Sequence, residues 1–249
     1  MKAMILAAGL GTRLRPLTND RPKALVEVAG HPLLEITLRR LASFGIRDVI
    51  VNVHHFADAI VDYLKKNDNC GMHIEISRED DVLLDTGGGL KNAAWFFLQD
   101  GPAQEPFLLH NVDVISTIDF GRMVQFHRDN NALATMAVQQ RETSRRLLFD
   151  EQGQLCGRQT GTSAPEVARP AKQPTPLAFA GVHVLSPELL GMIIEEGAFS
   201  IINTYLRLAA DGHRILAFRA DRYYWRDLGK LENITQATAD VKRGVLALG

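Results

Sequence analysis

The chain has 249 residues, of which 46% are hydrophobic and 23% charged, enough apolar side chains to bury one well-formed core. Its net charge of -1 and its pI of about 6.7 exclude a global basic field that would attract nucleic acid or an anionic membrane. Any phosphate chemistry must therefore depend on local basic groups.

The apolar segments are too short to cross a membrane, and the two cysteines match no metal or redox motif. Residues 1–13 (MKAMILAAGLGTR) contain a short apolar run that ends in a glycine loop, without the cleavage region of a signal peptide. Cys70 and Cys156 lie far apart; two reduced thiols are the simpler interpretation for an intracellular protein, and a disulfide stays as the alternative. The sequence thus predicts a cytoplasmic protein.

The first 140 residues alternate between predicted strands and helices. Residues 3–8 form a continuous apolar run, typical of a strand buried on both faces of a parallel sheet. A glycine loop follows, and then leucines at helical spacing from about Pro32 to Gly45. The later strands are expected at 48–53, 72–76, 106–114 and 132–138, and the later helices around 60–64, 89–98 and 120–129. This alternation predicts an α/β fold with a doubly wound, mostly parallel central sheet and helices on both faces.

The pattern changes after Gln140. Residues 145–158 predict a hairpin that turns near Gly153, and residues 158–176 predict a long loop without periodicity, best explained as a flap over a substrate site. Ser186-Pro187-Glu188 has the order of a helix cap, a first-turn proline and a first-turn acid. The remaining elements are strands at 177–185, 214–218 and 223–228 and helices at 201–212 and 231–245. No repeat or linker divides the chain, so we expect one domain over 1–249.

Glycines and cations gather in residues 7–16 (AAGLGTRLRP), directly after the first strand. Glycines let the backbone approach a ligand closely, and free N–H groups in such a turn can hold phosphate oxygens. Arg13 adds a fork of donors suited to phosphate, and Lys23 adds a compact positive charge. The spacing is not a Rossmann fingerprint or a P-loop, because the third glycine and the Gly-Lys-Ser/Thr ending are missing. A bare Gly-x-Gly also fits an ordinary turn between a strand and a helix.

Two acids stand at the ends of predicted strands. Asp113 lies in Asn-Val-Asp-Val (111–114), and Asp227 lies in Tyr-Trp-Arg-Asp-Leu-Gly (224–229). Ligands of α/β sheets gather outside the carboxyl ends of the strands, and Mg²⁺ prefers carboxylate and phosphate oxygens. Asp113 is therefore well placed for a metal and Asp227 is a second candidate, although a surface acid that caps the next segment would also explain Asp113.

Together, L-A-A-G-x-G-T-R-L-x-P-L-T and the P-K that follows resemble the signature of the sugar-1-phosphate nucleotidyltransferases, also called NDP-sugar pyrophosphorylases. The resemblance implies that the nucleotide is bound by Lys23 and Asn111 together with the loop residues Ala7, Ala8, Gly9, Gly11, Thr12 and Arg13. It implies catalytic roles for Arg13, Lys23 and Asp113, with Lys23 acting on the α-phosphate. It also implies that Asp113 and Asp227 bind the catalytic Mg²⁺.

A third motif, Leu-Asp-Thr-Gly-Gly-Gly (84–89), opens a predicted helix. Glycines there allow close approach of a base or ribose and expose N–H groups, and a flexible loop without ligand contact is the alternative. The resemblance implies that Gly87 and Gly88 contact the nucleoside. The triple-glycine form is similar to the branch that contains N-acetylmuramate-1-phosphate uridylyltransferase and mannose-1-phosphate guanylyltransferase-like proteins.

The segments that would bind the sugar match the family pattern less completely. Phe179-Ala180-Gly181 matches a family segment whose glycine lies against the sugar, but the Glu-Lys-Pro expected before it is replaced by residues 169–174 (RPAKQP). Lys172 or Arg169 is the candidate for the sugar phosphate, and a solvated loop charge explains either one equally well. Arg145 and Arg146 are expected on a solvated strand edge. Two further departures are Val112, where the family usually has glycine, and Lys230, where it often has threonine.

The resemblance implies a nucleotidyltransferase that joins an NTP, UTP or GTP, to a sugar 1-phosphate and releases pyrophosphate by Mg²⁺-dependent in-line displacement. The nucleotide part would be residues 1–140, and residues 141–249 would be a small β-rich part that binds the sugar phosphate. The alternative is a catalytically silent regulatory subunit of the same fold that binds a sugar nucleotide. A dinucleotide-dependent oxidoreductase does not fit, because the second strand ends at Asn52-Val53 without an acid for the ribose.

Overall fold

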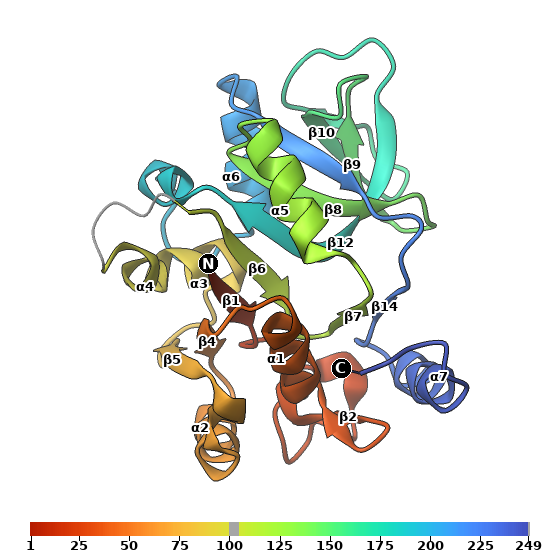
Figure 1. Cartoon of the computed structure of the whole chain (residues 1–249). Helices are drawn as coiled ribbons and strands as arrows, with labels where there is room; N and C mark the ends of the chain where they lie inside the picture. Colours follow the sequence, from red (N-terminus) through yellow and green to blue (C-terminus); the bar gives the residue numbers. More distant parts are fainter. Residues whose placement is uncertain (100–104, 249) are drawn as a thin grey trace.

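The computed structural model describes residues 1–99 and 105–248 (Figure 1). Its α-helices are α1 Leu33–Ser43, α2 Ala57–Lys66, α3 Asp85–Asn92, α4 Ala94–Leu98, α5 Phe120–Asp129, α6 Ile201–Ala210 and α7 Leu231–Lys242. Its strands are β1 Lys2–Leu6, β2 Glu27–Val28, β3 His31–Pro32, β4 Asp48–Val53, β5 His73–Arg78, β6 Phe107–Asn111, β7 Val114–Ser116, β8 Ala134–Gln139, β9 Arg145–Phe149, β10 Leu155–Thr160, β11 Glu166–Val167, β12 Thr175–Leu185, β13 Ile215–Arg219 and β14 Trp225–Asp227. Short 3-10 helices cover Thr12–Leu14, Lys23–Leu25, Asp68–Gly71 and Pro187–Met192.

Ten of the described strands form one mixed sheet, in the order β11-β10-β9-β12-β6-β1-β4-β5, with β8 beside β12 and β13 beside β8. β6, β1, β4 and β5 run parallel to one another, whereas β12 runs antiparallel to β6, β8 and β9. The four parallel strands come from the predicted nucleotide part, and the antiparallel half comes from the predicted sugar part except for β8.

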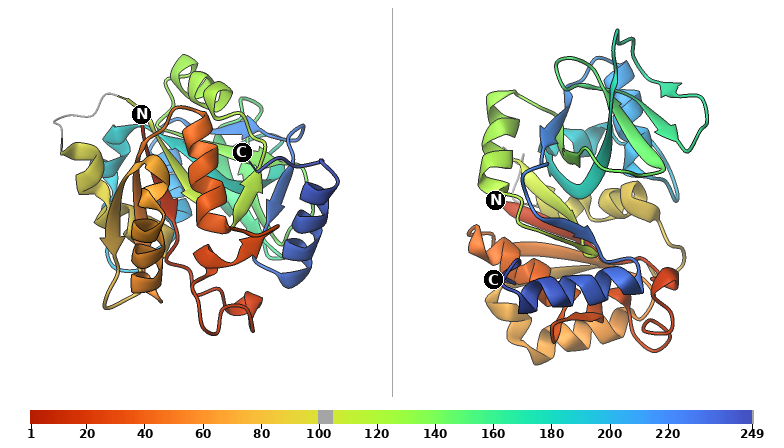
Figure 2. Two further views of the ribbon diagram at one scale, coloured as in Figure 1. Left: turned by 60° about the horizontal axis from the view of Figure 1, so that its bottom comes forward. Right: turned by 90° about the vertical axis from the view of Figure 1, so that its right-hand side faces the viewer.

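The central strands are buried on both faces because their side chains alternate between two hydrophobic cores. Ala3 and Ile5 of β1 pack with α1, α2 and α7 in one core, and Met4 packs with α3, α4 and α6 in the other. Figure 2 shows helices on both sides of the sheet. The prediction of a doubly wound α/β fold with a β-rich elaboration is confirmed, with the qualification that the sheet is mixed.

The prediction of a long loop over 158–176 is wrong in part: residues 161–165 and 168–174 are irregular and part of the segment lines a cavity, but strands occupy the rest. β10 continues to Thr160, β11 pairs with β10, and β12 already begins at Thr175, where it pairs with β9. The predicted hairpin at Gly153 is confirmed, since β9 and β10 are antiparallel and Gly153 has a φ of +74°. The segment extends the sheet because its backbone groups find partners on β9 and β10, which residue composition does not reveal.

Ser186 does not cap an α-helix as predicted. The segment Pro187–Met192 is a 3-10 helix, and the Ser186 hydroxyl donates to the Ala132 carbonyl at 2.8 Å instead. In the part of the chain that the structure describes, no helix is long and apolar enough to cross a membrane.

Candidate active site

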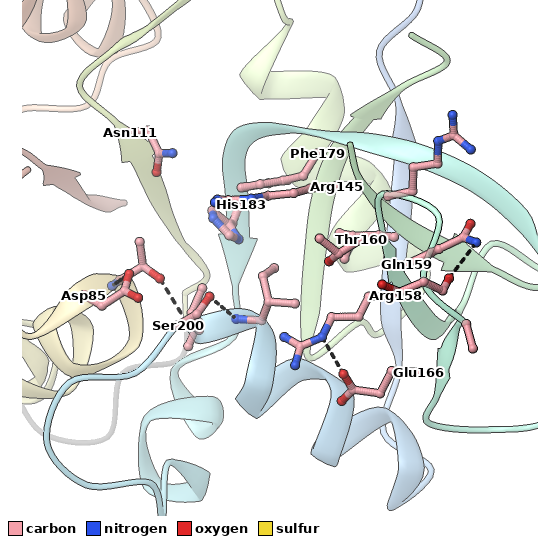
Figure 3. A pocket seen from close by; sticks show the side chains of 17 residues that line it. Asp85, Asn111, Arg145, Arg158, Gln159, Thr160, Glu166, Phe179, His183 and Ser200 are labelled. Atoms are coloured by element: carbon pink, nitrogen blue, oxygen red, sulfur yellow. Dashed lines mark hydrogen bonds and ion pairs between the residues drawn. The ribbon is translucent and has the colours of Figure 1, made fainter. Parts of the chain in front are cut away.

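Two adjoining cavities open at the carboxyl ends of β1, β4 and β6. The smaller, of about 300 Å³, is lined by Ala8, Gly9, Lys23, Asp113 and their neighbours. The larger, of about 630 Å³, lies between α6 and the strands β9, β10 and β12 (Figure 3). Asp85, Thr86 and Asn111 line both cavities, so ligands in the two cavities would meet at these three residues.

The loop after β1 takes its shape from a buried side chain on the neighbouring strand. Asn52 of β4 is only 2% exposed, and its Oδ1 accepts a hydrogen bond from the Ala7 amide at 2.8 Å. The Ala7 N–H is therefore not free for a phosphate. Gly9 is exposed and has open space where a Cβ would stand, whereas Gly11 has a φ of +64° and packs against Thr18. Gly9 is thus the place where this backbone can come closest to a ligand.

Asp113 and Asp227 lie side by side although 114 positions separate them. β14 pairs antiparallel with β7 so that Asp227 is opposite Val114, and the Leu228 amide donates to the Asp113 carbonyl at 2.7 Å. Lys23 completes the group, because its ammonium contacts Asp113 Oδ2. Three charged residues from distant motifs therefore meet beside the smaller cavity.

Arg13 reaches the same place from the 3-10 helix that follows the loop. A Cβ on Gly229 would lie 2.6 Å from Arg13 Nη2 and 2.7 Å from Asp227 Oδ1. Only glycine leaves room for the guanidinium to lie against the backbone at this point. Thr12 is exposed at the start of the same helix.

Uncommitted oxygens at this junction fit a hard divalent cation. Asp113 Oδ2 contacts Lys23, and Asp227 Oδ1 accepts a hydrogen bond from the Gly229 amide at 2.6 Å. Among the described residues, the second oxygen of each carboxylate, Asp113 Oδ1 and Asp227 Oδ2, has no hydrogen bond. The buried Oδ1 of Asn111, two residues before Asp113, has no partner either. Mg²⁺ is commonly held by one or two carboxylates plus phosphate oxygens. Within residues 1–99 and 105–248, no three His, Cys, Asp or Glu side chains cluster in a way that could hold a metal ion.

The triple glycine has a packing role in this structure. The amides of Gly87 and Gly88 both donate to the Phe199 carbonyl, at 2.9 and 3.4 Å, and the two residues are buried away from the cavity linings. A Cβ on Gly87 would lie 2.2 Å from the Phe199 ring. Their N–H groups are therefore not free as expected, because the glycines let α3 pack against the segment that enters α6, and contact of Gly87 and Gly88 with a nucleoside stays a prediction. Asp85 and Thr86 face the cavities instead.

Gly181 lies where β12 leaves regular pairing, with a φ of +74°. A Cβ there would stand 2.6 Å from Val114 and 3.2 Å from Asn111 Nδ2, so glycine allows β12 to pass close to the acid-bearing segment. Two β12 carbonyl groups next to this irregularity accept hydrogen bonds from side chains. Arg141 Nη2 donates to the Phe179 carbonyl and Trp225 Nε1 to the Ala180 carbonyl, each at 2.8 Å.

Arg141 is a further cation near Asp227 that no sequence motif indicates. Its guanidinium stacks on the Trp225 ring at 3.9 Å, and its Nε is buried without a partner. Burial lowers the pKa of Arg141, and the nearby Asp227 carboxylate acts in the opposite direction. Arg141 therefore holds a half-buried charge beside the aspartate pair. A single arginine in the unpatterned stretch after β8 gave no sequence signal for this.

The two proposed sugar-phosphate residues lie elsewhere. Lys172 is exposed and lines neither cavity, and Arg169 forms an ion pair with the buried Asp150 at 3.6 Å. The assignment of the sugar phosphate to Lys172 stays a prediction that the linings of the two cavities do not support. Arg145 and Arg146, predicted on a solvated strand edge, are exposed but line the larger cavity together with Arg158.

Comparisons with known proteins agree on one family. The family model described as "Nucleotidyl transferase" matches residues 2–244. N-acetylmuramate alpha-1-phosphate uridylyltransferase from Caulobacter vibrioides is 39% identical over 217 residues, which cover 84% of this chain and 85% of that protein. Mannose-1-phosphate guanylyltransferase from Mycobacterium tuberculosis is 30% identical over 247 residues, covering 98% of this chain and 65% of that protein. The chain thus spans slightly less than two thirds of that guanylyltransferase.

Solved structures share the fold. A UDP-glucose pyrophosphorylase in complex with UDP-glucose superposes with a TM-score of 0.77 at 17% identity, and 98% of each chain is covered. HddC from Yersinia pseudotuberculosis in complex with GMP-PN gives a TM-score of 0.73 at 23% identity, covering 96% of this chain and 99% of that one.

Proposed function

Since this chain belongs to the nucleotidyl transferase family, we propose that it joins an NTP to a sugar 1-phosphate and releases pyrophosphate. One observation carries the proposal. The cations Arg13 and Lys23 meet the carboxylates Asp113 and Asp227 at the edge of the smaller cavity, which adjoins a second, larger one. Two cavities that meet at a charged junction suit two phosphorylated substrates whose reacting groups must be in line.

The smaller cavity would bind the NTP. Backbone at Ala8 and Gly9 would approach the phosphates, and Arg13 and Lys23 would neutralise the charge that increases on the leaving pyrophosphate. A sugar-phosphate oxygen would then form a bond to the α-phosphorus while the bond from that phosphorus to the pyrophosphate oxygen breaks. No covalent enzyme intermediate is needed, because positioning and charge stabilisation suffice.

Asp113 and Asp227 would hold a Mg²⁺ ion through their free oxygens, Oδ1 and Oδ2 respectively. Bound there, the ion would polarise the phosphate oxygens and offset their negative charge. Lys23 contacts Asp113 in this structure, so the same ammonium is already oriented toward the place where phosphate oxygens would lie.

The sugar 1-phosphate would enter the larger cavity with its phosphate toward Asn111. Arg141 is stacked on Trp225 near Asp227, and among the described residues its buried Nε has no hydrogen-bond partner, although Arg141 lines neither cavity. We assign it the sugar phosphate in place of Lys172. Arginine suits this role because its fork of donors matches a phosphate.

At the finer level we propose UTP as the nucleotide and N-acetylmuramate 1-phosphate as the sugar. Support comes from the Caulobacter uridylyltransferase, which is 39% identical and covers most of both chains, whereas the Mycobacterium guanylyltransferase is 30% identical. GTP with mannose 1-phosphate is the competing pair.

A pyrophosphate-release screen tests the proposal. Purified protein with Mg²⁺ is incubated with each of the four NTPs and a panel of sugar 1-phosphates, including those of N-acetylmuramate, N-acetylglucosamine, glucose and mannose. Release that requires both an NTP and one sugar phosphate is expected. Nucleotide binding without release from any pair would contradict the proposal and favour a silent binding subunit.

A further inference from the structure

The larger cavity contains a positive charge that the proposed reaction does not use. Arg145 begins β9, where it pairs with Thr160 of β10. Figure 3 shows its side chain running beside Phe179 toward His183, into the space that faces Asn111. Among the described residues its guanidinium has no ion pair and no hydrogen bond.

The neighbouring charges do not neutralise Arg145. Arg158 donates to Glu166 Oε2 and to Asn203 Oδ1, both at 2.7 Å, so Glu166 is already committed (Figure 3). The cavity is lined by three arginines, at 145, 146 and 158, and by two acids, Asp85 and Glu166, a net charge of 3 − 2 = +1.

Arg145 is also separate from the Lys23–Asp113 pair, which would act on the nucleotide phosphates. It lines only the larger cavity, whereas Lys23 and Asp113 line only the smaller one. His183 cannot supply a competing charge, because burial lowers its pKa to about 3 and it remains neutral near pH 7. The remaining wall offers the hydroxyl and amide groups of Gln159, Thr160, Ser163 and Ser200. This wall suits a polar sugar ring with one additional anionic substituent.

We propose that Arg145 binds a carboxylate carried by the sugar ring itself, in addition to the 1-phosphate, and so selects acidic sugar 1-phosphates. The inference rests on the proposed function, and it assigns a specificity-determining residue within it. A guanidinium pairs with a carboxylate through two parallel hydrogen bonds, and a charge-assisted bond of this kind discriminates strongly against a substrate that lacks the group.

Two substrates that differ only in the acidic group test this assignment. N-acetylmuramate 1-phosphate carries a lactyl carboxylate, and N-acetylglucosamine 1-phosphate has the same ring without it. For the wild type we expect kcat/KM to favour the acidic sugar by about tenfold or more. Arg145→Gln should remove this preference through a higher KM for the acidic sugar at nearly unchanged kcat, and it should leave the neutral sugar unaffected.

Further variants complete the design. Arg145→Lys should restore part of the preference, because it keeps the charge but not the fork. Arg122→Gln, an exposed arginine on α5, is the matched control and should behave as wild type. Equal losses for both sugars in Arg145→Gln, or a wild type that does not favour the acidic sugar, would overturn the inference. Absence of pyrophosphate release with every sugar phosphate and NTP would instead contradict the proposed function.

Discussion

Lys23 and Asp113 form an ion pair in which each offsets the cost of burying the other. Their side chains are only 10% and 18% exposed, and a buried charge without a partner would be strongly destabilising. In the proposed reaction the same two groups face the phosphates, so they should matter far more for turnover than for substrate affinity.

Lys23→Ala and Asp113→Asn should each lower kcat by about 10²- to 10³-fold, because each removes a charge that stabilises the transition state. Steady-state pyrophosphate release measures the effect. Lys65→Ala, at an exposed position in the last turn of α2, is the control and should keep wild-type kcat. Turnover within a few-fold of wild type in either site variant would remove the role assigned to that residue.

His127 links protonation to stability. Thr135 Oγ1 lies 2.9 Å from its Nδ1 and Ser186 Oγ lies 3.0 Å from its Nε2. Since Ser186 donates its own proton to the Ala132 carbonyl, Nε2 carries the proton and Nδ1 accepts from Thr135. Burial lowers the pKa of His127 to about 4, from an ordinary value of 6.5.

The unfolded chain therefore binds a proton at this residue between pH 6.5 and 4, where the folded chain does not. The contribution of neutral His127 to the free energy of unfolding is complete above pH 6.5 and is lost as the pH falls toward 4. At pH 5 the free energy of unfolding is lower by about 2 kcal/mol. His127→Gln should consequently show a smaller drop in Tm between pH 7 and pH 5 than the wild type. His55→Gln, at an exposed position, should keep the wild-type drop in Tm. If Tm of His127→Gln falls between pH 7 and pH 5 by as much as that of the wild type, this role of His127 is contradicted.

At the residue scale, chemistry that is tied to a local motif could be predicted from the sequence. Arg13 and Lys23 belong to a glycine turn and the P-K that follows it, Asp113 and Asp227 lie at strand ends, and the family resemblance implies their roles; the structure brings all four together. Arg141 could not be found, because its place depends on the carbonyl of Phe179 and the ring of Trp225, 38 and 84 positions away.

At the element scale, α3 depends on close packing at its glycines. Gly87→Ala would place a Cβ 2.2 Å from the Phe199 ring and 3.0 Å from the Ile201 amide nitrogen. Phe199 is 9% exposed and belongs to the core that also contains Tyr205, so it has little room to move. α3 also carries Asp85 and Thr86, which line both cavities.

Gly87→Ala should destabilise the protein by about 1–3 kcal/mol, the usual cost of overpacking, and lower Tm by several degrees. Differential scanning calorimetry measures the change. Gly191→Ala is the matched control, since its Cβ would meet open space, and its Tm should stay near that of the wild type. A Gly87→Ala protein with unchanged Tm would mean that α3 does not pack tightly against residue 199.

Helices and strands with a regular sequence pattern can be predicted from the sequence, whereas the strands that pair with one another cannot. β4 and α5 have the predicted bounds, 48–53 and 120–129, because both show regular alternation or helical spacing. The strands β11 and the start of β12 have no such pattern, and they form because β10 and β9 offer open edges. Ser186 carried a valid cap signal, but its hydroxyl has a tertiary partner in Ala132.

At the scale of the whole molecule, the proposed active site requires both parts of the chain. Asp227 from the proposed sugar part is positioned by β7 of the proposed nucleotide part, and Arg13 lies against Gly229. β12 likewise pairs with β6, near the middle of the sheet. We therefore propose that residues 1–249 act as one domain, in which the junction of the two cavities forms only when both parts are folded.

The central claim is that Asp113 and Asp227 share one divalent cation at that junction. Electron paramagnetic resonance of Mn²⁺, titrated into the intact protein with a non-hydrolysable UTP analogue, measures the number of bound ions directly. The account predicts one bound Mn²⁺ per chain in the wild type and loss of that same ion in both Asp113→Asn and Asp227→Asn. A wild-type signal in Asp227→Asn, or two ions that the two substitutions remove separately, would contradict it.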